Sequence, residues 1–278
     1  MAQSFQGKVA LITGSSMGIG KAIARQLAQQ GAKVVLNARN AEKLARTEAG
    51  LQAEGLKVAA FAADVSNWDQ VSNLIRFCEK TYGGLDILIN NAGMATRGSV
   101  DAMAPEVFAK VSQVNLLGSI YPSKAALGLL RKSRGSVVFI STIASFHGLP
   151  YNSIYCASKK ALSAFSESFR LEEKGNGVHV GIAYVGFTEN DPEKIILDSN
   201  GKRMYLENRQ GIKKQTPDQV AHIINQMVRK RKKKVTLSFS GKALSVANWL
   251  APWLIDFIYT KNLPTIRANS EGEARYVK

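Results

Sequence analysis

The stretch "KVALITGSSMGIGKAIARQLAQQGAKVVLNARN", residues 8–40, decides the fold. It begins with a β-branched run at 8–13, passes through a glycine-rich turn at 13–20 into a helical pattern at 18–30, and ends in a second apolar run at 33–37. A strand, a glycine-rich turn, a helix and a second strand, in this order, predict a βαβ unit whose first turn can bind a dinucleotide.

The glycines of this turn explain why it suits a phosphate. They let the backbone come close to a pyrophosphate, and the N-terminus of the following helix offers free N–H groups and a favourable dipole. The alternative is a tight connection between strand and helix that binds nothing. Because the flanking strands and helix are all present, we predict cofactor contacts at the turn, made by Gly14, Ser16, Gly18, Ile19 and Gly20.

Apolar strand patterns and amphipathic helix patterns alternate along the rest of the chain. Strands are expected at 57–63, 86–90, 136–141, 178–184 and 235–239, and helices at 41–54, 68–82, 105–131, 153–173 and 216–231. Apolar strands separated by helices form a parallel sheet covered on both faces. We therefore predict an α/β fold: a single Rossmann-like, doubly wound domain over residues 1–240 with a seven-stranded parallel sheet flanked by helices, and an apolar C-terminal helical extension over 241–278.

Length, charge and cysteine content limit the class of protein. The 278 residues suffice for one large domain, and 37 lysines and arginines against 21 acidic residues give a net charge of +16. Such an excess attracts phosphates, anionic membranes or nucleic acid without selecting among them. Two cysteines and three scattered histidines offer neither a disulfide framework nor metal-ligand spacing, so no metal site is expected. The N-terminus shows no secretory signal pattern, which favours a cytoplasmic setting.

A tyrosine and a lysine share one face of the helix expected at 153–173. Tyr155 and Lys159 are four positions apart, so their side chains project in the same direction. A phenol with an ordinary pKa near ~10 exchanges protons poorly at pH 7, but an adjacent ammonium and the cationic ring of an oxidised nicotinamide lower that pKa. The pair predicts hydride transfer to or from a carbonyl carbon, with Tyr155 exchanging a proton with the carbonyl oxygen. The alternative is a surface tyrosine beside a surface lysine.

Five motifs, in order, resemble the short-chain dehydrogenase/reductase family over about residues 7–240. They are the Gly-x-x-x-Gly-x-Gly turn at 14–20, "AADV" at 62–65, "NNAG" at 90–93, "VNLLG" at 114–118 and "YCASK" at 155–159. The resemblance implies an oxidoreductase with a nicotinamide cofactor, assembled as a homodimer or homotetramer.

The resemblance also implies roles for individual residues. Asp64 would lie near the adenine, Asn115 would position a water in a proton relay, and Lys159 would hold the nicotinamide ribose. The cofactor contacts that it implies beyond the glycine turn are Asp64, Val65, Asn91, Gly93, Tyr155 and Lys159, and the catalytic residues are Asn115, Thr142, Tyr155 and Lys159.

The end of the second strand favours NADP(H) over NAD(H). NAD-binding proteins place an acidic residue there for the ribose 2′-OH, whereas this chain has Ala38 followed by Arg39. A guanidinium can pair with a 2′-phosphate, and such a charge-assisted bond contributes roughly 1.5–3 kcal/mol. The second basic residue that NADP-dependent relatives often carry inside the glycine turn is replaced by Met17. The alternative is that Arg39 is a solvated surface residue.

Two positions depart from the family pattern. Thr142 stands where the family usually has a serine that donates a hydrogen bond to the substrate carbonyl; Ser141 should point the opposite way if the strand continues through both. After the sixth strand the family commonly reads Pro-Gly-x-Ile/Val-x-Thr, whereas this chain reads "VGFTEN" at 185–190. Gly186 is kept, and Thr188 or Asn190 is expected to contact the cofactor.

The substrate is expected to be a small lipophilic carbonyl compound. Residues 187–215 form the segment that usually closes over the substrate in this family, and "NLLGSIYPSKAAL" at 115–127 resembles 3-ketodihydrosphingosine reductases. The hydroxysteroid dehydrogenase branch resembles the chain about as well. Ketones of the 3-ketosphinganine, 3-oxoacyl or steroid type remain open at this point.

The segment "ALSVANWLAPWLIDFIY" at 243–259 is apolar around most of a helix, apart from a strip formed by Ser245, Asn248, Asp256 and Tyr259. Its 17 residues are too few to span a bilayer, which takes about 20. We expect one helix here that extends the apolar wall of the substrate entrance. It either packs against protein, or it follows the basic run at 229–234 onto a membrane surface as a peripheral contact.

Two other functions remain as alternatives to the reductase. The chain could be a catalytically weak NADP(H)-binding regulator, against which the intact Tyr155–Lys159 pair argues. It could also be a basic membrane or nucleic-acid adaptor. Binding of nucleic acid is not expected, because no aromatic residues are interleaved with the basic run at 229–234.

Overall fold

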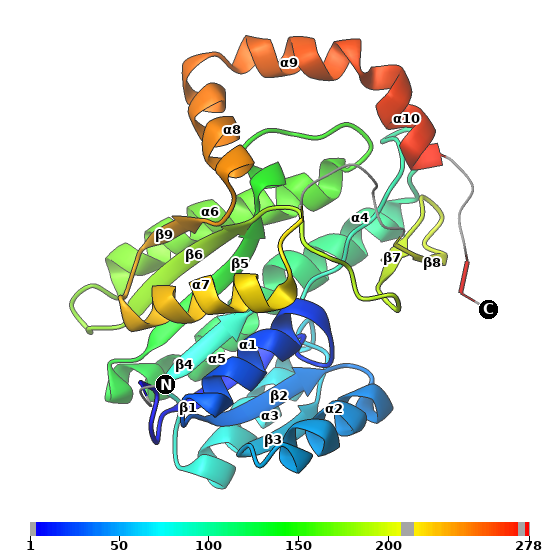
Figure 1. Ribbon diagram of the computed structural model, residues 1–278. Helices are drawn as coiled ribbons and strands as arrows, with labels where there is room; N and C mark the ends of the chain where they lie inside the picture. The colour runs from blue at the N-terminus through cyan, green and yellow to red at the C-terminus, as the bar shows by residue number, and fades with distance from the viewer. Residues whose placement is uncertain (1–3, 207–213, 272–275, 278) are drawn as a thin grey trace.

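The computed structural model describes residues 4–206, 214–271 and 276–277. Its centre is one sheet of seven parallel strands in the order β3-β2-β1-β4-β5-β6-β9 (Figure 1). The order reverses between β1 and β4, as in doubly wound dinucleotide-binding folds, so the predicted sheet is confirmed. The strands are β1 (Val9–Thr13), β2 (Lys33–Ala38), β3 (Val58–Ala62), β4 (Ile87–Asn90), β5 (Ser136–Thr142), β6 (His179–Val185) and β9 (Lys234–Thr236).

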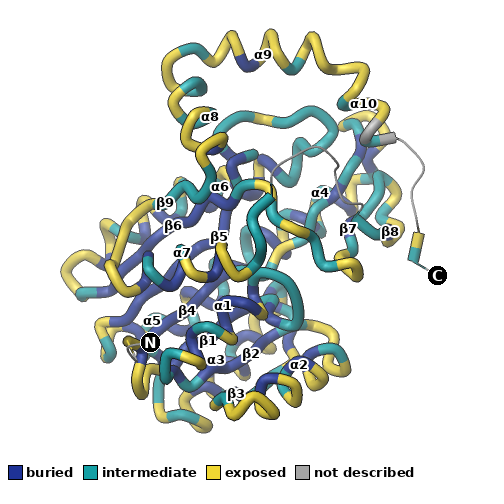
Figure 2. Tube along the Cα trace, viewed as in Figure 1, coloured by how far each residue is buried: buried dark blue, intermediate teal, exposed yellow. Residues whose placement is uncertain are grey.

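Helices cover both faces of the sheet, because successive side chains of a strand point to opposite faces. Along β1, the fully buried Ile12 belongs to one apolar core and the fully buried Leu11 to the other (Figure 2). The first core joins the sheet to α1 (Gly18–Gln29), α2 (Ala41–Ala53) and α7 (Pro217–Arg229). The second joins it to α3 (Trp68–Tyr82), α5 (Gly118–Ser133) and α6 (Ser153–Glu172). The carboxyl ends of the strands are left to form the site.

The helix expected over 105–131 is divided in the structure. It consists of α4 (Pro105–Ser112), a π-helical turn (Gln113–Leu117) and α5. Directly after the turn, Gly118 packs so closely on Val65 that a Cβ there would lie 2.7 Å from Val65 Cγ2. The chain is thus helical through the expected range, which confirms the predicted helical pattern, and the π-helical turn within it carries Asn115.

The expected substrate segment, 187–215, contains a hairpin that the sequence pattern did not predict. It is formed by β7 (Ile195–Leu197) and β8 (Arg203–Tyr205). The Leu197 N–H donates to the Ala95 carbonyl at 3.1 Å, which attaches the hairpin to the loop after β4. Residues 207–213 of this segment lie outside the described residues.

The C-terminal extension is helical, but the prediction of a single helix over 243–259 is wrong. α8 (Phe239–Leu250) and α9 (Pro252–Lys261) are separated by Ala251, whose φ and ψ of −147° and 65° are not helical. A residue before proline disfavours the helical conformation, so Pro252 explains the break. α10 (Leu263–Glu271) follows, and Figure 1 shows α8 and α9 projecting beyond the sheet. Residues 272–275 and 278 of the extension lie outside the described chain.

The strand expected at 235–239 ends earlier than predicted, at Thr236, because Ser238 caps α8 by accepting a hydrogen bond from the Gly241 N–H. β9 therefore separates the basic run at 229–234 from α8. Part of that run is structural, since the Arg231 guanidinium donates to the carbonyl oxygens of Arg134 and Gly177 at 2.9 and 2.5 Å. The run is thus less free to bind a membrane beside α8 than its sequence suggests.

Candidate active site

Three predicted catalytic side chains meet at the carboxyl end of β5. Thr142 ends that strand, and α6 presents Tyr155 and Lys159 from the same face. The Thr142 hydroxyl is hydrogen-bonded to the Tyr155 phenol. The Lys159 side chain, only 5% exposed, donates from Nζ to the Ile140 carbonyl at 2.9 Å. The structure therefore brings two hydroxyl groups and one ammonium to a single edge of the sheet.

The pKa of Tyr155 differs from the value expected from the sequence. Burial raises the pKa of Tyr155 to about 12, and the hydrogen bond from Thr142 offsets this only in part. Burial, together with the positive charge of Lys194, lowers the pKa of Lys159 to about 8. The predicted lowering of the Tyr155 pKa is wrong for the protein by itself, because the loss of hydration outweighs the stabilisation of a phenolate. Tyr155 is consequently protonated at pH 7.

The neighbouring hydroxyls take different directions, as the strand register requires. The Ser141 side chain is buried and donates to the Lys159 carbonyl at 3.0 Å. Thr142 Oγ1 accepts from the Ala144 N–H at 3.3 Å, which leaves its own hydrogen available for another partner. The geometry thus gives Thr142, not Ser141, access to Tyr155.

Asn115 lies behind the catalytic face, fully buried in the π-helical turn. Its amide nitrogen donates to the Met94 carbonyl at 2.9 Å and to Ser158 Oγ at 3.0 Å, while Oδ1 accepts from the Met94 N–H at 2.8 Å. A Cβ at Gly93 would lie 3.2 Å from both Asn115 Oδ1 and Lys159 Nζ. The Asn115 side chain therefore holds this corner together, and its backbone carbonyl accepts from the Ser119 hydroxyl at 3.1 Å.

The glycine turn fits a phosphate. Gly14 has a φ of 64°, and a Cβ there would lie 2.8 Å from Ala92 Cα. A Cβ at Gly20 would collide with the Gly14 carbonyl. Among the described side chains none caps the N-terminus of α1, whereas Asn40 and Asn67 cap α2 and α3. The first N–H groups of α1 are thus left for an anion.

Three other predicted cofactor residues support this turn. The Asn91 amide donates to the carbonyls of Thr13 and Gly14 at 2.9 and 3.0 Å, so its side chain braces the turn. Ile19 is half-buried against the first core, and the Ser16 carbonyl accepts from the Thr47 hydroxyl at 2.9 Å. The structure uses these groups to fix the turn and not to present side chains into it.

At the end of β2, Arg39 lies near the predicted adenine segment. Its guanidinium is 3.8 Å from the Asp64 carboxylate, and the Arg39 side chain is 47% exposed. Burial raises the pKa of Asp64, but hydrogen bonds from Ser66 and the charge of Arg39 outweigh it and hold that pKa below its ordinary value. The Val65 side chain is buried beneath Gly118, which leaves only its backbone for a ligand.

After β6, Gly186 packs against Ser238, where a Cβ would lie 2.6 Å from Ser238 Oγ. Thr188 is half-buried; its hydroxyl donates to the Gly186 carbonyl at 3.4 Å, and its backbone forms a bridge with Gln215. Both residues thus lie where the chain leaves the sheet. Neither contacts Tyr155 through a described hydrogen bond.

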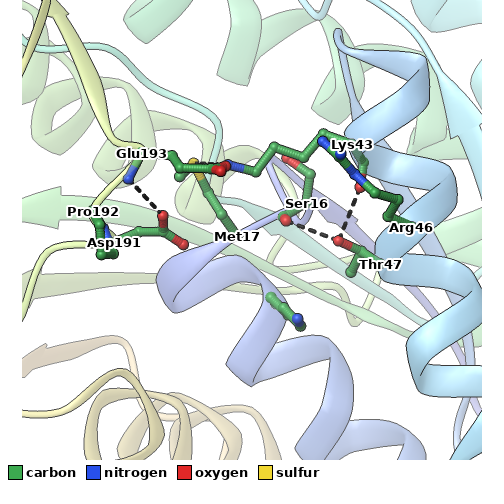
Figure 3. Close-up of a pocket in the computed structure, with 9 residues that line it drawn as sticks. Ser16, Met17, Lys43, Arg46, Thr47, Asp191, Pro192 and Glu193 are labelled. Carbon is green, nitrogen blue, oxygen red and sulfur yellow. Dashed lines mark hydrogen bonds and ion pairs between the residues drawn. The ribbon is translucent and has the colours of Figure 1, made fainter.

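A pocket of about 420 Å³ opens beside the glycine turn (Figure 3). Ser16 and Met17 line it from the turn, Lys43 and Arg46 from α2, and Glu193 from the substrate segment. Sequence reasoning missed Lys43 and Glu193. Lys43 stands four residues after Arg39, in the first turn of α2, which could have drawn attention to it, whereas nothing in the sequence joins Glu193 to α2.

Sequence reasoning also missed His147, in the loop between Thr142 and Tyr155. Its Nδ1 lies 2.8 Å from Asn248 Oδ1 on α8, and its Nε2 lies 2.9 Å from Asp256 Oδ1 on α9. The His147 ring also packs edge-on against Tyr259, with ring centroids 5.5 Å apart. Three members of the predicted polar strip, Asn248, Asp256 and Tyr259, therefore contact the loop between Thr142 and Tyr155. These contacts place α8 and α9 over the site.

Within residues 4–206, 214–271 and 276–277, no cluster of three or more His, Cys, Asp and Glu side chains is arranged to hold a metal ion. No helix in the described part of the chain is long and apolar enough to cross a membrane.

Comparison with known proteins identifies the family. The profile described as short chain dehydrogenase matches residues 8–198. The 3-ketodihydrosphingosine reductase of Bos taurus is 35% identical over 184 residues, which cover 64% of this chain and 55% of the relative, so the chain spans about half of that protein's length. A dehydrogenase/reductase SDR family protein 7-like of Drosophila melanogaster is 29% identical over 261 residues, covering 92% of this chain and 80% of the relative.

Solved structures agree with this result. A short chain dehydrogenase from Burkholderia cenocepacia, in complex with NADP, superposes with a TM-score of 0.75 at 29% identity, covering 84% of this chain and 98% of the other. The family profile includes the glycine turn, the first six strands of the sheet and the Tyr155–Lys159 helix. A match of this length shows that the chain belongs to the short-chain dehydrogenase/reductase family.

Proposed function

We propose that this protein is an NADPH-dependent oxidoreductase that interconverts a lipophilic ketone and its secondary alcohol. The observation that carries the proposal is the hydrogen bond between Thr142 and Tyr155, one helical turn from the Lys159 ammonium. Two hydroxyl groups that meet in this way can donate to one carbonyl oxygen, where negative charge develops during reduction.

The residues around the glycine turn fit a dinucleotide, since the N–H groups of α1 are uncapped and Gly14 allows close approach. Ala38 and Arg39 favour NADP(H), in keeping with the NADP bound by the Burkholderia relative. When bound, NADPH supplies the hydride. By family resemblance Lys159 would hold the nicotinamide ribose, with Gly186 and Thr188 near the carboxamide.

The chain's own contribution to reduction is the proton. Tyr155, with its pKa raised to about 12, is in the protonated form at pH 7 and donates to the carbonyl oxygen. Thr142 donates a hydrogen bond to the same oxygen. Asn115 acts as a positioning residue, because its side chain holds Met94 and Ser158 around Lys159. In this proposal residues 1–240 carry the chemistry and 241–278 form an extension to the substrate entrance.

A lipophilic ketone is the substrate class that the surroundings favour. The bovine relative is named for 3-ketodihydrosphingosine, and the hydroxysteroid branch remains an alternative. α9 contacts the loop between Thr142 and Tyr155 through His147, and its exposed Trp253 and Phe257 offer a lipophilic compound an apolar surface outside that loop. A homodimer or homotetramer in the cytoplasm is part of the proposal by family resemblance.

Peripheral contact with a membrane is also part of the proposal. The outer face of α8 and α9 is apolar and exposed: Trp249 is 81% exposed, Trp253 69% and Phe257 62%. The inner face carries the buried Ile255, and Asn248 and Asp256 contact the His147 ring, although the Asp256 side chain stays 70% exposed. An exposed apolar helix face of this kind suits the interfacial region of a bilayer.

The proposal is tested by measuring NADPH oxidation with 3-ketosphinganine, 3-oxoacyl and steroid ketones. We expect turnover of at least one class, and Tyr155→Phe should abolish it while leaving the dissociation constant for NADPH within about twofold, since only the proton donor is lost. An inactive parent protein that binds NADPH tightly would favour the regulator. Unchanged turnover by Tyr155→Phe would refute the assigned role of Tyr155.

A further inference from the structure

The pocket beside the glycine turn already holds an internal anion. Glu193, from the substrate segment, lies with its carboxylate 2.5 Å from the Lys43 ammonium on α2. Figure 3 shows the Lys43 side chain reaching from α2 toward Glu193 and Met17. This ion pair joins the cofactor half of the molecule to the segment expected to close over the substrate.

The position of Lys43 suggests what it serves. Its ammonium lies 3.7 Å from Met17 Sδ, at the turn position where NADP-dependent relatives often carry a basic side chain. The Thr47 hydroxyl donates to the Ser16 carbonyl at 2.9 Å and so fixes α2 against the turn. α2 thus supplies, next to Met17, the cation that the turn itself lacks.

Glu193 is presented to this cation by a turn of its own segment. Asp191 Oδ1 accepts from the Glu193 N–H at 3.0 Å, and the Asp191 carbonyl accepts from the Lys194 N–H at 2.9 Å. The hydrogen bond and charge of Lys43, followed by the charge of Arg46, lower the pKa of Glu193. Glu193 is therefore a carboxylate at neutral pH, although its side chain is 66% exposed.

We infer that Glu193 occupies, in the free protein, the place of the cofactor 2′-phosphate, and that Lys43 is the second cation of the phosphate site beside Arg39. A 2′-phosphorylated nucleotide then displaces Glu193 and releases residues 191–206 from α2, whereas a nucleotide without that phosphate leaves the ion pair intact. This inference rests on the proposed use of NADP(H). It makes Glu193 a specificity-determining residue that links the type of cofactor to the substrate segment.

Charge explains the exchange. Phosphate carries more negative charge and more acceptor oxygens than one carboxylate, and it can pair with Arg39 as well as Lys43. The two anions cannot share the lysine without repelling each other. Because the Glu193 side chain is 66% exposed, solvent weakens its attraction to Lys43, so the displacement costs little.

The test measures binding of 2′,5′-ADP and of 5′-ADP, at one low salt concentration, by isothermal titration calorimetry. Glu193→Gln should tighten 2′,5′-ADP binding by about two- to fivefold, because the phosphate no longer competes with the Glu193 carboxylate for Lys43. The same variant should leave the affinity for 5′-ADP unchanged. Lys43→Met should weaken 2′,5′-ADP at least tenfold, as expected for a lost charge-assisted bond. In the Lys43→Met background, Glu193→Gln should have no further effect.

Glu106→Gln, on the exposed surface of α4, is the matched control for loss of one negative charge. Hydrogen exchange gives a second readout: residues 191–206 should exchange faster with 2′,5′-ADP than with 5′-ADP. If the parent protein binds both nucleotides equally, the preference for NADP(H) fails and this inference fails with it. If the preference holds but Glu193→Gln does not tighten 2′,5′-ADP, or tightens 5′-ADP equally, only the role of Glu193 is refuted.

Discussion

The hydroxyl of Thr142 is hydrogen-bonded to the phenol of Tyr155, although the loop at 143–152 separates them in the chain. β5 supplies the first group and α6 the second. The loop between them is held by α8 and α9 through His147. The distance between the two hydroxyls therefore depends on the sheet, on one helix and on the C-terminal extension together.

Substitution of Thr142 tests this relationship. Thr142→Ala should lower turnover by roughly 10²–10³-fold, the usual loss when one donor to a developing oxyanion is removed, while Thr142→Ser should stay near the parent. Ser141→Ala is the matched control, because Ser141 donates to the Lys159 carbonyl. Single-turnover rates would measure the effect. A harmless Thr142→Ala with a damaging Ser141→Ala would place the active hydroxyl one residue earlier.

Ionisation of Lys159 predicts a pH profile. Its folded pKa of about 8 is below the ordinary value of 10.5, so the side chain loses its charge as the pH rises through about 8. If the charged form holds the ribose, kcat/KM for NADPH should fall above that pH. The free energy of unfolding should respond oppositely: the unfolded chain binds more protons between about pH 8 and 10.5, so this residue's contribution to stability rises with pH there.

Lys159→Met separates the two effects. The variant should lose activity at every pH, and its gain in melting temperature over the parent should be largest near pH 7 and should shrink toward pH 10. Lys160→Met, on the exposed side of α6, is the control and should leave the inflection near pH 8 in place. Persistence of that inflection in Lys159→Met, measured as NADPH affinity, would assign it to another group.

The sequence predicted most of this architecture because its signals are local. The turn at 13–20 and the alternation of strands and helices depend on neighbouring residues, and the register of β5 follows from side-chain alternation alone. The break at Ala251 was also predictable, since Pro252 disfavours a helical residue before it. The parts predicted correctly are those that a few adjacent residues determine.

Apart from the break at Ala251, the main parts that were missed depend on contacts between distant segments. In the π-helical turn, the Asn115 side chain donates to Met94 and Ser158. No pattern of neighbouring residues in the sequence indicates these contacts. The Lys43–Glu193 pair joins residues 150 positions apart, and His147 reaches α8 across 101 positions. The expected lowering of the Tyr155 pKa includes the bound oxidised cofactor, whereas in the protein by itself burial, a property of the folded chain, raises that pKa.

Cofactor preference is expected to depend on Arg39. NADPH should bind more tightly than NADH, and Arg39→Gln should weaken NADPH by about ten- to a hundredfold through loss of a charge-assisted bond. Arg39→Asp should go further and reverse the preference, since a carboxylate repels the 2′-phosphate and can accept from the ribose 2′-OH. Fluorescence titration with both nucleotides measures each case. Equal affinities of the parent for NADPH and NADH would contradict the assignment.

The outer face of α8 and α9 is expected to bind anionic membranes. Over residues 239–270 the charged side chains are Lys242, Lys261, Arg267 and Asp256, and the last of these contacts His147. Three of these four charges are cationic, and they accompany an exposed apolar surface that includes Trp253 and Phe257. Truncation after Lys242 would cut through α8 and free His147, so surface substitutions are the cleaner change.

The double variant Trp253→Ser, Phe257→Ser should reduce sedimentation with anionic liposomes severalfold, because both side chains are more than half exposed and would lose their apolar contact with lipid. It should also raise KM for long-chain ketones presented in liposomes far more than for a small soluble ketone, since a lipophilic substrate reaches the loop at His147 from the bilayer. Leu171→Ser, at 69% exposure on α6, is the matched control and should change neither quantity. Binding should weaken as salt rises, because the cations act through screened charge. Unchanged liposome binding together with a concentration-dependent change of oligomeric state would show instead that α8 and α9 pack against a second copy of the chain.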